Sequence, residues 1–392
     1  MVTFLPSRPG PLADVPSFDR AIGGAESNVA CTLARAGHRT RWVSRVGADG
    51  FGDHLVRTIA GYGVDTSAVE RDPERPTGIY FRTDGERPTA APHPGVPDPA
   101  APGTAAPAEL SEVLYYRAGS AASAMSPATV PPQAVDAGRV LHLTGITAAL
   151  SADCLALMRA LTADREPAAD RATTAARAPA GEGAPAGEEA PSGGDAAPRP
   201  LVSFDVNYRV GLWHTAAESG AAVLLELARR SDLVFVGEDE AAAAWGVTGG
   251  PGAVRELLRE PAVLVVKQGA RGATAFVGDA PGVFAPALEV EVVSPVGAGD
   301  AFAAGFLAGT LRGLPVRDRV RHGHLMAAAA LTDAGDLAAP PDRAAADRLV
   351  ALDGERWGRL RLGPGWTASG PQSAAAGRPD RPGAHEPEVR SA

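Results

Sequence analysis

The chain has 392 residues, of which 45% are hydrophobic, and it carries a formal net charge of −9 at pH 7. This length accommodates one large α/β domain with a smaller appendage. Because the acidic balance leaves no basic patch to neutralise phosphates, we expect no nucleic-acid partner. The same charge balance is typical of a cytoplasmic protein, which is the expected localisation.

Other composition features exclude further classes. No apolar run approaches the roughly 18 residues of a membrane span, so we expect no membrane partner. Residues 1–6 lack a basic region and a cleavage site, which indicates no signal peptide. The two cysteines, Cys31 and Cys154, have no CxxC spacing, so a disulfide framework and a zinc site are not expected.

Strand and helix patterns alternate along the chain. In chain order they are a strand at 41–46, a helix at 49–60, a strand at 140–143, a helix at 151–162, a strand at 201–205, a helix at 216–230, and strands at 232–236 and 262–266. Apolar Val/Leu strands separated by amphipathic helices predict a mostly parallel sheet covered on both faces. Ligands of such sheets bind beyond the carboxyl ends of the strands.

Two aromatic, β-rich segments, 77–82 and 112–117, flank a Pro/Ala-rich stretch. We expect them to form a hairpin within a small β-sheet lid, with strands near 2–24, 77–85 and 111–120. The stretches 86–108, 164–200 and 363–392 are rich in Pro, Ala or Gly and poor in large apolar residues. They are predicted to be two disordered inserts and a disordered tail.

The strongest chemical signal is Gly297-Ala298-Gly299-Asp300, followed by a helical pattern at 301–311. Glycines at a helix start let backbone N–H groups face an anion. An aspartate beside them can accept the proton of a hydroxyl that attacks a phosphate. The alternative is a Gly-rich turn whose aspartate only caps the helix.

Three motifs resemble the PfkB family of ribokinase-like carbohydrate kinases. The segment from Val296 to Phe302 is similar to its C-terminal signature, Gly23-Gly24-Ala25-Glu26-Ser27-Asn28 to its N-terminal signature, and Gly47-Ala48-Asp49-Gly50-Phe51-Gly52 to its G-x-D-x-x-G segment. The resemblance implies a ribokinase-like three-layer α/β/α domain over 1–341, with ATP and Mg²⁺ as cofactors and a sugar as substrate. By the same resemblance, members carry a central strand before the segment matching Val2-Thr3-Phe4. Here that strand is largely missing, so either the true start lies upstream or the sheet and part of the sugar site are compromised.

The resemblance also implies roles for residues. Asp300 would be the catalytic base, and Gly297, Ala298 and Gly299 the anion hole. The ATP-binding residues would be Lys267, Gly269, Gly272, Gly297 and Gly299. Glu240 would influence Mg²⁺ indirectly, at a segment where the family's usual Asn is replaced by Gly237.

The substrate prediction depends on arginines. The family resemblance implies that Gly24 and Asn28 contact the sugar. The segments around Tyr116-Arg117 and Asp205-Val206-Asn207-Tyr208-Arg209 resemble the 2-keto-3-deoxygluconate kinase branch of the family. A guanidinium binds a carboxylate through two parallel hydrogen bonds, which a neutral sugar does not require. The best prediction is therefore phosphorylation of 2-keto-3-deoxygluconate, with Tyr116, Arg117 and Arg209 at the substrate.

Two alternatives stay open. One is a kinase for a neutral sugar such as fructose or ribose, and the other is a non-catalytic sugar-binding regulatory homologue. A dinucleotide-binding oxidoreductase is disfavoured, because Gly23-Gly24 is not a G-x-G-x-x-G fingerprint. The exposed edges expected for the lid sheet make a homodimer through the lid a further possibility.

Overall fold

The computed structural model describes residues 1–8, 10–82, 113–163, 199–213, 218–333, 335 and 337–368. The predicted insert 86–108 lies wholly outside these residues, as do 164–198 of the second insert and 369–392 of the predicted tail. The described part of the tail contains a 3₁₀ turn at Trp366–Ala368.

A six-stranded sheet forms the centre of the molecule, in the order β12-β11-β10-β9-β8-β7. Its strands are β7 (Val140–Thr144), β8 (Leu201–Asp205), β9 (Leu233–Gly237), β10 (Val263–Lys267), β11 (Gly272–Val277) and β12 (Val283–Pro286). Strands β7 to β10 are parallel to one another, and β11 and β12 complete one side in antiparallel pairs. The predicted mostly parallel sheet is confirmed.

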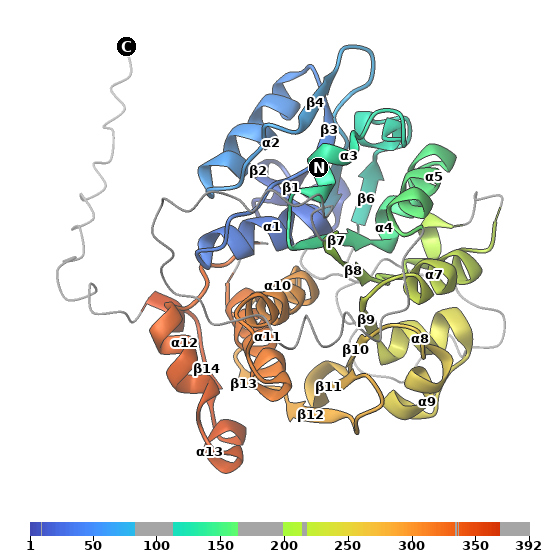
Figure 1. Cartoon of the computed structure of the whole chain (residues 1–392). Helices are drawn as coiled ribbons and strands as arrows, with labels where there is room; N and C mark the ends of the chain where they lie inside the picture. Colours follow the sequence, from blue (N-terminus) through green and yellow to red (C-terminus); the bar gives the residue numbers. More distant parts are fainter. Residues whose placement is uncertain are drawn as a thin grey trace, which may run out of the picture.

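Helices cover both faces of this sheet, because alternate residues of the buried strands point to opposite sides. On one face Val234 and Val236 pack with Leu224 and Leu227 of α7 (Gly220–Arg229). On the other face Phe235 packs with Phe302 and Phe306 of α10 (Ala298–Leu311), together with residues of α1 (Ala25–Arg35) and α11 (Val316–Leu331). The domain is thus a three-layer α/β/α structure (Figure 1).

A separate four-stranded sheet, in the order β2-β1-β5-β6, corresponds to the predicted lid. It is built from β1 (Val2–Pro6), β2 (Phe18–Ile22), β5 (Ile79–Arg82) and β6 (Val113–Tyr116). β1 pairs antiparallel with β2 and parallel with β5, and β5 pairs antiparallel with β6. The edges of this sheet are therefore β2 and β6.

The strand predicted at 41–46 does not join the central sheet. The observed strand β3 (Ser44–Gly47) pairs with β4 (Val69–Asp72) in a two-stranded parallel sheet, and α2 (Gly50–Gly61) connects the two strands in sequence. Among the described residues the central sheet ends at β7, and Val2-Thr3-Phe4 belongs to β1 of the small sheet. A cavity lined by Trp42, Val43, Leu141 and Leu143 separates β7 from the segment leading into β3.

The chain continues past residue 341 as folded structure. Trp357 is fully buried and packs with Leu325 of α11, and the Arg321 guanidinium lies 4.6 Å from the centroid of its ring. The remaining elements are α3 (Pro132–Asp136), α4 (Gly145–Ala148), α5 (Ala152–Leu161), α8 (Glu238–Trp245), α9 (Gly250–Leu257), α12 (Arg343–Val350), α13 (Gly354–Gly358), β13 (Glu289–Val290), β14 (Arg361–Leu362), and 3₁₀ turns at Leu12–Asp14, Ala121–Ala124, Val210–Leu212 and Gly269–Arg271. No helix within the described ranges is long and apolar enough to span a membrane.

Candidate active site

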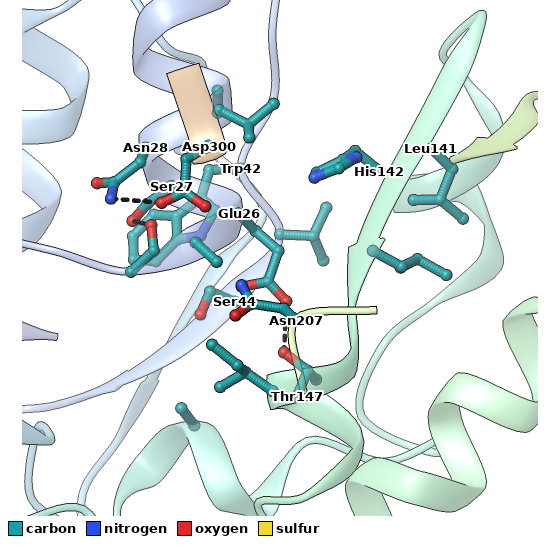
Figure 2. Close-up of a pocket in the computed structure, with 18 of the residues that line it drawn as sticks. Glu26, Ser27, Asn28, Trp42, Ser44, Leu141, His142, Thr147, Asn207 and Asp300 are labelled. Carbon is teal, nitrogen blue, oxygen red and sulfur yellow. Dashed lines mark hydrogen bonds between the residues drawn. The ribbon is translucent and has the colours of Figure 1, made fainter. Parts of the chain in front are cut away.

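The cavity beside β7 has a volume of about 1160 Å³ and extends to the carboxyl ends of β7 and β8, where the small sheet and the starts of α1 and α10 line it. Its lining includes Asn28, Arg117, Arg209 and Asp300, which are far apart in sequence (Figure 2 shows Asn28 and Asp300). The fold therefore brings most of the predicted substrate-side residues to one cavity.

Asp300 and Asn28 are joined directly. The Asn28 side chain donates from Nδ2 to Oδ2 of Asp300 across 2.9 Å, linking α1 to α10 (Figure 2). The two helices pack together through Val29 and Phe302. Asn28 is buried and Asp300 half-buried at the cavity, so the carboxylate is held in one orientation while a ligand can still reach it.

The glycine-rich turn before Asp300 forms the start of α10. Gly297 is the N-cap residue with φ +75°, a left-handed conformation that glycine adopts at little cost. Ala298 and Gly299 then open a 14-residue helix, and Gly299 is exposed. The unpaired N–H groups and the dipole of the helix make this turn suited to an anion.

Gly24 has the matching place at the other helix. It is the N-cap residue of α1 with φ +147°, and a Cβ there would lie 2.9 Å from Oγ of Ser27. Gly24 lines the cavity four residues before Asn28. Its conformation lets the chain turn sharply from β2 into α1.

The lid residues fall on two faces of β6. Tyr115 and Arg117 line the cavity, and the guanidinium carbon of Arg117 lies 4.4 Å from the centroid of the Tyr115 ring. The ring of Tyr80, which also lines the cavity, lies 5.5 Å from the Tyr115 ring, measured between centroids. Tyr116 contacts Phe81 instead and is 58% exposed. The structure thus brings Tyr115 and Tyr80 to the cavity, and it does not bring Tyr116 there. Sequence reasoning missed this because it did not fix which residues of β6 face inward.

Charge at the lid side favours an anion. Burial lowers the pKa of the Arg117 guanidinium, against the influence of Tyr115 and Glu26. A negatively charged ligand group beside a partly desolvated cation stabilises the charged form of that cation. Arg209, which follows β8, lines the same cavity.

Three further polar residues at this cavity were missed by the sequence analysis. Glu26 accepts a hydrogen bond from the Thr147 hydroxyl, and burial raises the pKa of Glu26. Asn207 is the described non-glycine residue with a positive φ, +42°, and its buried Oδ1 has no hydrogen-bond partner. Strained backbone next to a cavity is a signal that only coordinates provide.

The predicted nucleotide residues Lys267, Gly269 and Gly272 lie at the end of β10 and in the turn into β11. Lys267 ends β10, and its Nζ lies 3.0 and 3.2 Å from the two carboxylate oxygens of Asp205, the last residue of β8. Gly272 has φ +141°, and a Cβ there would lie 2.3 Å from the carbonyl oxygen of Ala285, so the turn into β11 requires glycine. Gly269 opens the short 3₁₀ turn before it, with φ +59°.

Glu240 lies in the first turn of α8. Its Oε2 accepts a hydrogen bond from the Gly237 backbone N–H at 2.7 Å, and burial raises its pKa while Lys267 acts in the opposite direction. No group of three or more His, Cys, Asp or Glu side chains in the described part of the chain could hold a metal ion. Mg²⁺ usually binds one or two protein carboxylates together with phosphates and water. A single carboxylate such as Glu240 fits that pattern.

Comparison with known proteins shows which family this chain belongs to. Residues 2–95 and 196–343 match the model of the pfkB family of carbohydrate kinases. The chain is 30% identical over 345 residues to the 2-dehydro-3-deoxygluconokinase of Bacillus subtilis (strain 168), covering 88% of this chain and 90% of that protein. It is 33% identical over 344 residues to the enzyme of the same name from Thermoproteus tenax, covering 87% and 89%. Fructokinase-1 of Oryza sativa subsp. japonica is 26% identical over 313 residues, covering 78% of this chain and 79% of that protein.

The fold comparison points the same way. The crystal structure of the PfkB protein from Polaromonas sp. JS666 superposes with a TM-score of 0.65 and 31% identity, covering 88% of this chain and 96% of that chain. The three-layer domain, the small sheet and the Gly-Ala-Gly-Asp helix start define a ribokinase-like α/β protein. The chain belongs to the pfkB family of carbohydrate kinases.

Proposed function

We propose that this carbohydrate kinase transfers the γ-phosphoryl group of ATP to a terminal hydroxyl of 2-keto-3-deoxygluconate, which is also called 2-dehydro-3-deoxygluconate. The observation that carries the proposal is the Asn28–Asp300 hydrogen bond in a cavity that Arg117 and Arg209 also line. The pair presents a carboxylate for the hydroxyl, and the arginines present two cations for a carboxylate. The names of the two relatives from Bacillus subtilis and Thermoproteus tenax support the same substrate.

In this mechanism the sugar hydroxyl lies against Asp300 and attacks the γ-phosphorus in line with the leaving ADP oxygen. Asp300 takes the hydroxyl proton as the new P–O bond forms. The N–H groups at Gly297, Ala298 and Gly299 stabilise the negative charge on the transferring phosphoryl group. Asn28 holds Oδ2 of Asp300 so that the other oxygen can face the hydroxyl.

The nucleotide would lie beyond Gly299, along Lys267, Gly269 and Gly272. Glu240 would hold Mg²⁺, through water, when it arrives with the phosphates. Bound Mg²⁺ neutralises phosphate charge and polarises the phosphoryl oxygens.

The test is an ADP-release assay of the purified full chain with 2-keto-3-deoxygluconate, gluconate, fructose and ribose, each with and without Mg²⁺. We expect Mg²⁺-dependent turnover with the keto-acid and a kcat/KM for it at least about 100-fold above that for fructose, since Arg117 and Arg209 can bind the carboxylate of the keto-acid and fructose has no carboxylate. Preference for fructose or ribose would overturn the sugar-acid assignment and retain the kinase. Sugar binding by calorimetry without turnover of any substrate would instead favour a non-catalytic sugar-binding protein.

A further inference from the structure

Lys267 is the only lysine in the sequence, and the fold places its ammonium next to the glycine turn of α10. A Cβ built on Gly299 would lie 3.9 Å from Nζ of Lys267. The ammonium lies between the carboxyl ends of β8 and β10, the edge at which ligands of parallel sheets bind. The ammonium of Lys267 therefore lies beside the Gly297–Gly299 turn, which is suited to binding an anion.

Asp205 holds this cation in place. Both carboxylate oxygens contact Nζ, at 3.0 and 3.2 Å, and the Asp205 side chain is 4% exposed whereas that of Lys267 is 21% exposed. A lysine stem has four rotatable bonds and is ordinarily mobile at a surface. The buried carboxylate fixes its end, and the more exposed side of the ammonium remains accessible.

The charge of Lys267 is also fixed. Burial by itself lowers the pKa of Lys267, but the carboxylates of Asp205, Glu240 and Asp300 outweigh burial and raise the pKa above its usual value. The side chain is therefore an ammonium at every pH at which a kinase works. It can neutralise negative charge, but it cannot act as a general base.

The donor count leaves one hydrogen for a ligand. An ammonium has three N–H donors, and the two oxygens of Asp205 engage two of them at most. Resting on the proposed kinase function, we propose that Lys267 donates its remaining hydrogen to the γ-phosphoryl group in the Gly297–Gly299 turn, and that Asp205 is the positioning residue that keeps it there. Lys267 is then a catalytic residue, and Asp205 acts through it.

With Lys267 in this role, the phosphoryl transfer involves the same bonds and the same proton transfer as in the proposed mechanism. The bond from the γ-phosphorus to the ADP oxygen breaks, the bond to the sugar oxygen forms, and the hydroxyl proton goes to Asp300. Lys267 gains and loses no proton. Its contribution is to stabilise the charge on the equatorial oxygens, which is greatest while the phosphoryl group is between donor and acceptor.

A purely structural role for Lys267, neutralising the buried Asp205, makes a different prediction for a double variant. Lys267→Met leaves a buried, unpaired carboxylate and is expected to lower the melting temperature. Lys267→Met/Asp205→Asn removes both charges and should restore most of that loss. If Lys267 acts on the phosphoryl group, kcat of the folded double variant stays about 100-fold or more below wild type, with the sugar KM within about 3-fold. A double variant whose kcat recovers together with its melting temperature would show that the pair is only structural.

A matched control is Arg230→Met, which removes a cation from an ion pair with Glu226 at the end of α7, where both side chains are partly exposed. It should change neither kcat nor KM. Lys267→Arg provides a second comparison: the charge is kept, but the planar head cannot occupy the position of the ammonium, so we expect kcat between those of wild type and the double variant.

The single lysine also gives a reading that does not depend on turnover. In protein grown with ¹³C-labelled lysine, the side-chain Cε–Hε groups give the signal of Lys267 alone. We expect this signal to shift with a non-hydrolysable β,γ-imido ATP analogue and to stay unchanged with adenosine, which lacks phosphates. Calorimetric binding of the analogue without any shift would overturn the role of Lys267 and leave the proposed function intact. Absence of analogue binding would overturn both.

Discussion

The Asn28 amide donates a 2.9 Å hydrogen bond to the Asp300 carboxylate, joining two residues that are 272 positions apart. Each lies in the first turns of its helix, Asn28 in α1 and Asp300 in α10. The contact connects the two glycine-rich segments of the chain at the cavity.

Replacing Asp300 with Asn should lower kcat by about 100-fold or more, because the amide keeps the shape of the side chain but cannot accept the hydroxyl proton. Binding of the β,γ-imido ATP analogue, measured by calorimetry, should change little. Asp53→Asn on α2, whose side chain is 57% exposed, is the control and should retain wild-type kcat. Near-normal turnover of Asp300→Asn would remove Asp300 as the base.

Replacing Asn28 with Asp would place two carboxylates at hydrogen-bond distance. Each disfavours ionisation of the other, so the pKa of the pair rises. The acidic limb of the kcat profile should therefore move to higher pH, by about one unit or more. An unshifted pH profile, measured from pH 5 to pH 9, would mean that Asn28 does not contact the catalytic carboxylate in the working enzyme.

Adjacent tyrosines of β6 provide a matched pair. Tyr115→Ala should raise the KM for the sugar by about 10-fold or more, because Tyr115 lines the cavity and its ring stacks under Arg117. Tyr116→Ala should leave that KM within about 2-fold, since Tyr116 faces Phe81 on the other side of the strand. The reverse order of effects in steady-state kinetics would contradict the observed register of the lid.

The buried side chain of His324 should make the stability of the fold depend on pH. Burial lowers its pKa from 6.5 to about 4, although Nε2 contacts the Ala285 carbonyl oxygen at 3.0 Å. Between these two pH values the unfolded chain binds a proton that the native protein does not, so stability falls as the pH is lowered.

Urea denaturation at pH 7.5 and pH 5.0 measures this effect. We expect His324 to account for about 2 kcal/mol of the loss in unfolding free energy between the two pH values. His324→Gln keeps a donor for the carbonyl and does not titrate, so its loss should be smaller by that amount. An equal loss in the variant would assign the pH dependence to other groups.

The contact between α10 and α11 depends on Gly305. A Cβ there would lie 2.3 Å from the carbonyl oxygen of His322, so Gly305→Ala must push the helices apart. We expect it to lower the unfolding free energy by about 1–3 kcal/mol. Gly61→Ala, at the end of α2 with no heavy atom within 4 Å, is the control and should be neutral or slightly stabilising.

Much of the fold was predictable because it depends on local patterns. The apolar runs of β8, β9 and β10 and the helices between them alternate so regularly that a covered parallel sheet follows. The strand predicted at 41–46 shows the limit. The local pattern predicts a strand there, but pairing between segments separated in the sequence placed it with β4 in another sheet.

The sequence by itself determined the family and the two glycine-rich segments that carry Asn28 and Asp300. Short motifs record which backbone turns and side chains are present, and these are local properties. Tertiary structure decided which of Tyr115 and Tyr116 faces the cavity, because strand register is set by cross-strand partners. It also decided that Asp205 holds the single lysine, Lys267, beside Gly299. That contact joins the ends of β8 and β10, which are distant in sequence and come together only at the carboxyl edge of the folded sheet.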